Sequence, residues 1–176
     1  MFLYHVYSHN DSTTTKIYDA LINGLNIENA SIWGGNPKAN LYPNIVNNIQ
    51  SRTSDEWLEL NNSFTLEASS IPFKNYLMFP FKDQKIYVFD YMIAEDYLDE
   101  YYEKEVAKRL GESTEGFKTE NLPSKETLVK MYWDSAIALK DYVDHPIYAK
   151  PEYVCCQKIN SKHLKGYIDG KLITNY

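Results

Sequence analysis

Strand-like segments occur at both ends of this 176-residue chain, with helix-like segments between them, and this order is what most constrains the fold. The first strand is predicted at Phe2–Ser8, and the clearest one, with alternating apolar residues, at Lys85–Tyr91. Two closing strands are predicted at Tyr153–Cys156 and Leu164–Ile168. The order favours an α+β fold, a split mixed or largely antiparallel β-sheet core with flanking helices.

The middle of the chain contains apolar residues at helical spacing. The most distinct helix is predicted at Ala94–Leu110, because acidic residues fill its first turns, basic residues its last, and Gly111 follows. Further strands are predicted at Ser63–Leu66 and Ile71–Phe81. The other predicted helices are Lys16–Asn23, Pro43–Leu60 with a break near Arg52, and Lys125–Leu139.

Composition is that of an ordinary globular protein, with 44% hydrophobic and 24% charged residues. This length predicts a single domain spanning residues 1–176, large enough for a core without metal or disulfide. The two cysteines are adjacent, at Cys155 and Cys156, so neither a disulfide framework nor a zinc spacing is available. No apolar run approaches membrane-spanning length and no signal peptide precedes the first strand, so we expect a cytoplasmic protein with no membrane partner.

Two features of the composition bear on partners. The net charge of −6 gives no reason to expect broad, nonspecific binding to nucleic acid. The 16 tyrosines supply rings with a polar tip, which suit core edges, protein interfaces and base stacking alike. A nucleic acid would therefore be bound over only a few nucleotides, by stacking on tyrosine or tryptophan.

Three polar residues are candidates for a site. Glu152 follows Pro151 at the start of a short apolar strand, where a carboxylate could reach a cleft; the alternative is an edge glutamate facing water. His5 lies in the middle of the first strand. Arg52 lies at a helix junction, where it could bind an anion or form a solvated ion pair, and the spacing does not choose between these.

Taken together, these residues resemble the ADP-ribosyltransferase superfamily, nearest in layout to the toxin branch that modifies nucleic acids. The resemblance begins with Tyr4-His5-Val6, where the family has a histidine that helps to bind NAD, and a short helix ending in Gly24-Leu25 follows. Ile49-Gln50-Ser51-Arg52 matches the position of an arginine important for catalysis in that branch. Pro151-Glu152-Tyr153-Val154 matches the strand that carries the catalytic glutamate.

The resemblance implies an NAD-dependent mono-ADP-ribosyltransferase, a toxin or conflict effector that modifies a nucleobase in RNA or DNA. NAD would be a substrate, and no metal would be required. Glu152 would be the catalytic carboxylate and Arg52 a phosphate or acceptor contact. His5 would contact the ribose, on a strand neighbouring that of Glu152, beside Tyr4 and Tyr7, the latter where many relatives have threonine.

Three alternatives stay open. The same fold could hydrolyse NAD, or it could modify a protein. From a different class, the chain could be a non-catalytic module whose tyrosine-rich acidic surface binds a protein partner. A toxin would also require a neutralising antitoxin protein.

Overall fold

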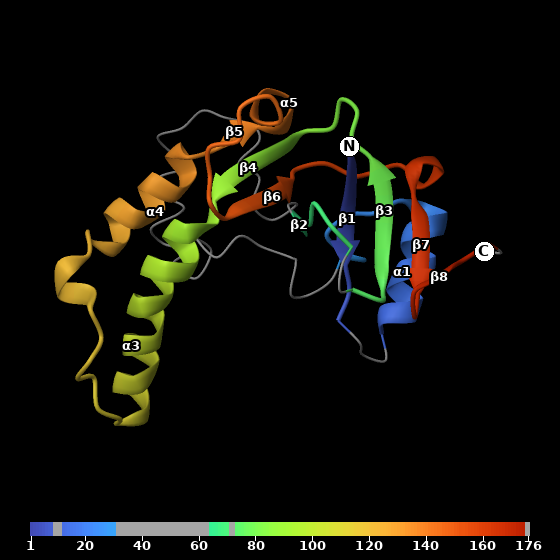
Figure 1. The fold of residues 1–176 in the computed structure, drawn as a ribbon. Helices are drawn as coiled ribbons and strands as arrows, with labels where there is room; N and C mark the ends of the chain where they lie inside the picture. The colour runs from blue at the N-terminus through green and yellow to red at the C-terminus, as the bar shows by residue number, and fades with distance from the viewer. Residues whose placement is uncertain (9–11, 31–63, 71–72, 175–176) are drawn as a thin grey trace.

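The structure is a computed structural model, and it describes residues 1–8, 12–30, 64–70 and 73–174. Two four-stranded antiparallel sheets form its centre, and the long helices project from one end (Figure 1). The prediction of an α+β protein is confirmed, and both sheets are antiparallel throughout. The predicted helix at Pro43–Leu60 lies outside the described residues.

The first sheet has the strand order β1-β3-β7-β8, and the second has the order β2-β6-β4-β5. The strands of the first sheet are β1 (Phe2–Val6), β3 (Tyr76–Pro80), β7 (Lys165–Ile168) and β8 (Lys171–Leu172). The strands of the second sheet are β2 (Phe64–Leu66), β6 (Pro151–Cys155), β4 (Ile86–Asp90) and β5 (Ile137–Ala138).

A short backbone bridge joins the two sheets. The amide of Tyr4 in β1 donates to the carbonyl of Glu67, just after β2, at 2.9 Å. The amide of Glu67 donates back to the carbonyl of Tyr4 at 2.7 Å. The chain ends are thereby brought together, since β2 in turn pairs with the C-terminal strand β6.

Helix α1 (Thr13–Asn23) covers one face of the first sheet through Ile17, Ala20 and Leu21. Gly166 in β7 allows α1 to pack close to this strand, because a Cβ added at Gly166 would lie only 2.7 Å from the Cδ1 of Leu21. The helix ends at Gly24 as predicted.

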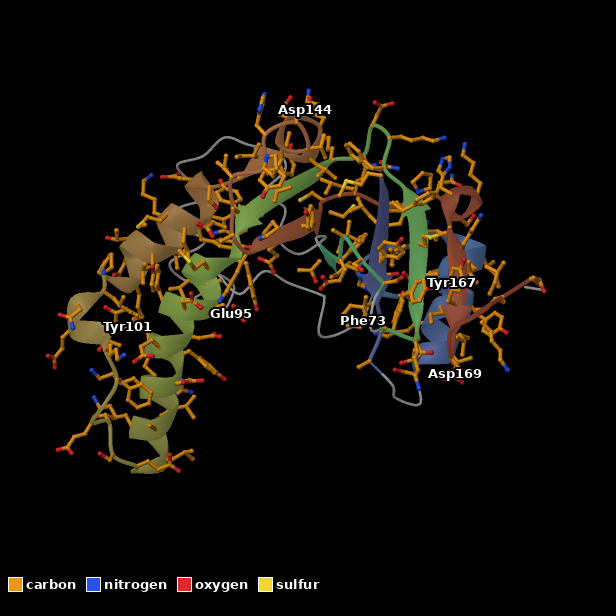
Figure 2. The ribbon with its side chains drawn as sticks, viewed as in Figure 1. Phe73, Glu95, Tyr101, Asp144, Tyr167 and Asp169 are labelled. Atoms are coloured by element: carbon orange, nitrogen blue, oxygen red, sulfur yellow. The ribbon has the colours of Figure 1, made fainter. Side chains whose placement is uncertain are left out.

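The second sheet carries the helical part of the chain. A π-helix (Ile93–Leu98) continues directly into α3 (Asp99–Leu110), in place of the single helix predicted from Ala94. Lys150, which precedes β6, pairs with Glu95 at 2.7 Å and with Asp96 at 2.9 Å, and so ties the π-helix to the approach to that strand (Glu95 is labelled in Figure 2).

The helix predicted at Lys125–Leu139 is wrong at its C-terminal end. Helix α4 covers Lys125–Asp134, Ile137–Ala138 forms β5 on the edge of β4, and α5 covers Leu139–Tyr142. Ser135 provides the physical reason for the early end. Its hydroxyl donates to the carbonyl of Tyr132 at 2.6 Å and accepts from the amide of Asp90 at 3.0 Å, which competes with continued helix.

Two hydrophobic clusters form the core. One lies between α1, the first sheet and one face of the second sheet, and it includes Leu3, Phe64 and Leu77. The other lies between the opposite face of the second sheet and the helices, and it includes Phe89, Tyr132 and Val154. The second sheet is therefore covered on both faces.

Short 3₁₀ helices at Thr119–Asn121 and Ser161–His163 complete the described elements. Within the described ranges, no helix combines the length and the apolar character needed to cross a membrane.

Candidate active site

Glu152 is the second residue of β6 and pairs across the sheet with Phe89 of β4. The side chain is partly exposed, whereas Val154 and Cys155 further along the strand are buried. The carboxylate thus lies where the strand emerges from the core, as the sequence predicted for a glutamate at the start of this strand.

Tyr132 of α4 holds this carboxylate in place. Its hydroxyl donates to Glu152 Oε2 at 2.5 Å, and the tyrosine itself is completely buried. Burial first, and then the charge of Glu152 and this hydrogen bond, raise the pKa of Tyr132 well above its ordinary value. The phenol therefore stays protonated at physiological pH and acts as a hydrogen-bond donor to the carboxylate.

Aromatic packing fixes the position of that phenol. The rings of Tyr132 and Phe89 are stacked at 4.8 Å and 11°, and Trp133 meets both rings edge-on. Phe89 is also the cross-strand partner of Glu152, so the strand pairing that places Glu152 also places the ring on which Tyr132 stacks. Such support from packed neighbours is what holds a reactive group in one geometry.

His5 is fully buried in the first cluster. Its Nδ1 donates to the carbonyl of Thr65 in β2 at 2.9 Å, and its ring meets Tyr7 and Phe64 edge-on. Burial lowers the pKa of His5 to about 4, opposed by the bond to Thr65. In this conformation the ring is neutral and fastens β1 to β2.

The two tyrosines predicted beside His5 occupy different environments. Tyr7 is buried, and its hydroxyl donates to the carbonyl of Asn29 at 2.9 Å. Tyr4 is partly exposed, and its ring meets that of Tyr76 edge-on at 5.7 Å. Of the two, only Tyr4 presents a surface that a ligand could contact.

The expectation that His5 and Glu152 lie on neighbouring strands and face one cleft is wrong. β2 lies between β1 and β6, and the two residues belong to different sheets. His5 packs against Phe64, which is in register with Cys155, and Cys155 is three positions along β6 from Glu152. Side chains three apart on a strand point to opposite faces, so His5 and Glu152 approach the second sheet from opposite sides.

Arg52, the third predicted residue, lies outside the described part of the chain. Two hollows lined by described residues, of about 310 and 630 Å³, include neither His5 nor Glu152. In residues 1–8, 12–30, 64–70 and 73–174, no cluster of three His, Cys, Asp or Glu side chains has the arrangement of metal ligands. Burial raises the pKa of the Cys155 thiol to about 12, so this cysteine is not a ready nucleophile.

Tyr132 is the residue that the sequence did not reveal as part of a site. Its helical spacing with Leu128 predicts a core residue, and the side chain is indeed buried. Only its hydroxyl reaches the site, and Tyr132 is 20 positions before Glu152 in the sequence. A buried tyrosine must satisfy its hydroxyl somewhere, which is a general reason to look for a partner but does not name one.

A carboxylate held by a neutral phenol at the start of a strand can accept a hydrogen bond from a ligand hydroxyl and stabilise nearby positive charge. No family model, curated protein or solved structure was found to match this chain. A functional proposal therefore rests on two observations. These are the geometry around Glu152 and the resemblance of the short motifs.

Proposed function

We propose that this protein is an NAD-dependent mono-ADP-ribosyltransferase that modifies a nucleobase in RNA or DNA, with Glu152 as the catalytic carboxylate. The observation that supports the proposal is the position of Glu152, partly exposed at the start of β6 and hydrogen-bonded to the buried hydroxyl of Tyr132. A carboxylate fixed in this way needs little rearrangement when charge develops beside it.

The reaction would break the bond between the nicotinamide nitrogen and C1′ of the ribose. The bonding electron pair leaves with nicotinamide, and positive charge builds on the ribose as in glycoside hydrolysis. Glu152 would accept a hydrogen bond from a ribose hydroxyl and stabilise that charge. A lone pair of the acceptor base then forms the new bond to C1′, and the proton that the acceptor loses passes to water.

The other predicted residues take supporting parts in this proposal. His5 would position β1 against β2 rather than contact the ribose, because its ring is fully buried. Tyr4 could contribute a ring face to a ligand. Arg52 remains the proposed contact for phosphate or acceptor.

Release of nicotinamide from NAD by the purified chain, with single-stranded RNA or DNA oligonucleotides present, tests the proposal. Glu152→Gln keeps the size of the side chain but removes its charge, and we expect a rate loss of about a hundred- to a thousandfold. The matched control is Glu95→Gln, which removes an exposed carboxylate paired with Lys150 and should leave the rate unchanged. Mass spectrometry of the oligonucleotides should show one added ADP-ribose per modified base.

Each other outcome supports a different function. NAD loss without an ADP-ribosylated oligonucleotide would favour a hydrolase, and labelling of added protein would favour a protein acceptor. If wild type and Glu152→Gln consume NAD equally, or if neither does so with any acceptor, the transferase proposal fails and a binding module becomes the better interpretation.

A further inference from the structure

Among the described residues, one face of the first sheet packs against α1, and the side chains on the other face, called the open face below, are partly exposed or exposed. Residues of β1 and β3 alternate in burial, and those that face α1, such as Leu3, Leu77 and Phe79, are fully buried. Figure 1 shows α1 behind β7 on that side. The opposite face contains no fully buried side chain; its residues are Phe2, Tyr4, Val6, Tyr76, Met78, Pro80, Lys165, Tyr167 and Leu172.

Three tyrosines form a row across the open face. Tyr4, Tyr76 and Tyr167 come from the adjacent strands β1, β3 and β7, and all three are partly exposed. Tyr76 and Tyr167 are direct cross-strand partners with rings stacked at 4.6 Å and 17°, and Tyr4 meets Tyr76 edge-on at 5.7 Å. Figure 2 labels Tyr167 on β7 at one end of this row.

A tyrosine row could simply stabilise the sheet through cross-strand pairs. Partial exposure of all three rings leaves part of each ring accessible to a ligand, and Phe2 and Leu172 at the margins of the same face are 49% and 48% exposed. Open antiparallel sheets with aromatic side chains on adjacent strands are suited to stacking with flat bases.

The charge on this face differs between its two sides: exposed Glu67 is the bridge partner of Tyr4 on the β1 side, and Lys165 is on the β7 side. A polyanion would therefore be held on the β7 side. Lys165 lies on the face itself, opposite Met78, and is exposed. His163, two positions before Lys165, also has basic neighbours. Burial, and then the charges of Lys82 and Lys162, lower the pKa of His163. Lysines outnumber acidic residues in 157–174, whereas acidic residues outnumber basic ones in 90–150, so the excess negative charge of the chain lies in the helical part.

We propose that the open face of the β1-β3-β7-β8 sheet binds single-stranded nucleic acid, with two or three bases stacked on Tyr4, Tyr76 and Tyr167 and a phosphate on Lys165. This inference deepens the proposed function by assigning a surface to its acceptor. The binding itself needs neither NAD nor Glu152, so the two proposals can fail separately.

Fluorescence anisotropy tests the surface with labelled oligouridine and oligothymidine of about ten nucleotides, without NAD, at low salt. We expect wild type to bind and the Tyr76→Leu/Tyr167→Leu variant to bind at least about tenfold more weakly, because leucine keeps apolar bulk but offers no ring. Tyr76→Phe/Tyr167→Phe keeps both rings and should bind like wild type. Lys165→Gln should reduce the salt dependence by about one phosphate contact.

Tyr102→Leu is the matched control, since Tyr102 is 40% exposed on α3 in the acidic helical part and should not affect binding. Thermal unfolding of each variant checks that the sheet remains folded.

No binding by wild type, or equal binding by wild type and the double leucine variant, overturns the proposal. Loss of self-association in the leucine variant, without any nucleic-acid binding, would instead identify a protein interface and also overturn it. Transferase activity on a nucleic acid that survives the double leucine change would refute this surface while leaving the proposed function intact.

Discussion

At the residue scale, the hydroxyl of Tyr132 helps to hold the Glu152 carboxylate. The 2.5 Å bond joins a completely buried donor to a partly exposed acceptor, so the donor cannot easily turn elsewhere. Hydrogen bonds to charged groups contribute about 1.5–3 kcal/mol, which makes this contact one of the stronger ones in the second cluster. Tyr132 is a positioning residue in the proposed mechanism, because it acts on the substrate only through Glu152.

Tyr132→Phe removes this hydroxyl and keeps the ring stacked on Phe89. We expect the transfer rate to fall by about tenfold. As the pH is lowered, the variant should lose its activity at a higher pH than wild type does. The reason is that a hydrogen bond to a carboxylate favours its ionised form. A pH–rate profile of both proteins measures the effect.

The control for this variant is Tyr101→Phe, which removes a hydroxyl that donates to the carbonyls of Thr119 and Pro123. It should leave the pH–rate profile unchanged. If Tyr132→Phe lowers stability without moving the profile, the hydroxyl serves only the fold.

His5 makes stability depend on pH. Its pKa is about 4 in the folded chain, against an ordinary value near 6.5, so the unfolded chain binds more protons between these values. The stabilisation from neutral His5 is fully present above about pH 6.5 and is lost as the pH falls toward 4. Between pH 7.5 and 5 we expect a loss of about 2 kcal/mol.

His5→Gln keeps a donor near Thr65 but does not titrate in this range. Urea unfolding at both pH values should show a smaller loss in the variant than in wild type, although the variant is less stable at neutral pH. Equal losses in the two proteins would mean that other groups cause the acid sensitivity.

At the element scale, Gly24 joins the end of α1 to the strand-like segment that approaches Ile159. Leu25 and Ile159 exchange two backbone hydrogen bonds of 2.9 Å, so the chain must turn sharply at this point. Gly24 has φ of +91°, and an added Cβ would lie 2.6 Å from the carbonyl oxygen of Ile159. Both the backbone conformation and the space therefore require glycine.

Gly24→Ala should lower the free energy of unfolding by more than about 2 kcal/mol, because strain and a backbone clash combine. Gly111→Ala is the matched control. Gly111 also has positive φ, at +73°, but nothing lies within 4 Å of its added Cβ, so we expect a loss of only about 1 kcal/mol. Urea unfolding measures both, and equal losses would show that the contact with Ile159 is unimportant.

At the scale of the whole molecule, the chain divides its charge between two regions. The helical part around α3 and α4 carries the excess negative charge, while the segment through β7 and β8 is basic. The overall charge of −6 therefore does not describe the C-terminal segment, where lysines are in excess.

If the proposed transferase modifies an abundant nucleic acid, expression of the intact chain should arrest growth, and a neutralising partner should be needed by its host. Glu152→Gln should be harmless when it is expressed to the same soluble level. Growth curves after induction measure this. Arrest by both proteins would assign the toxicity to binding, and arrest by neither would remove the toxin assignment.

The sequence by itself predicted most of the elements. Alternating apolar residues located β1, β4 and β7, and the distribution of charge located α3, because these signals are local to the chain. It also singled out Glu152 at the start of β6. The end of α4 was missed, since Ser135 bonds to Asp90, a residue 45 positions away, and no local pattern records that contact.

Only the tertiary structure decided what surrounds each candidate residue. Strand periodicity predicts that His5 and Glu152 lie on strands. That β2 lies between these strands, and that the two side chains lie on opposite faces of the second sheet, follows from pairing between distant segments. The partnership of Tyr132 with Glu152 and the tyrosine row across β1, β3 and β7 arise in the same way. Local sequence sets the type of element and which side chains share a face, whereas long-range register sets which faces meet.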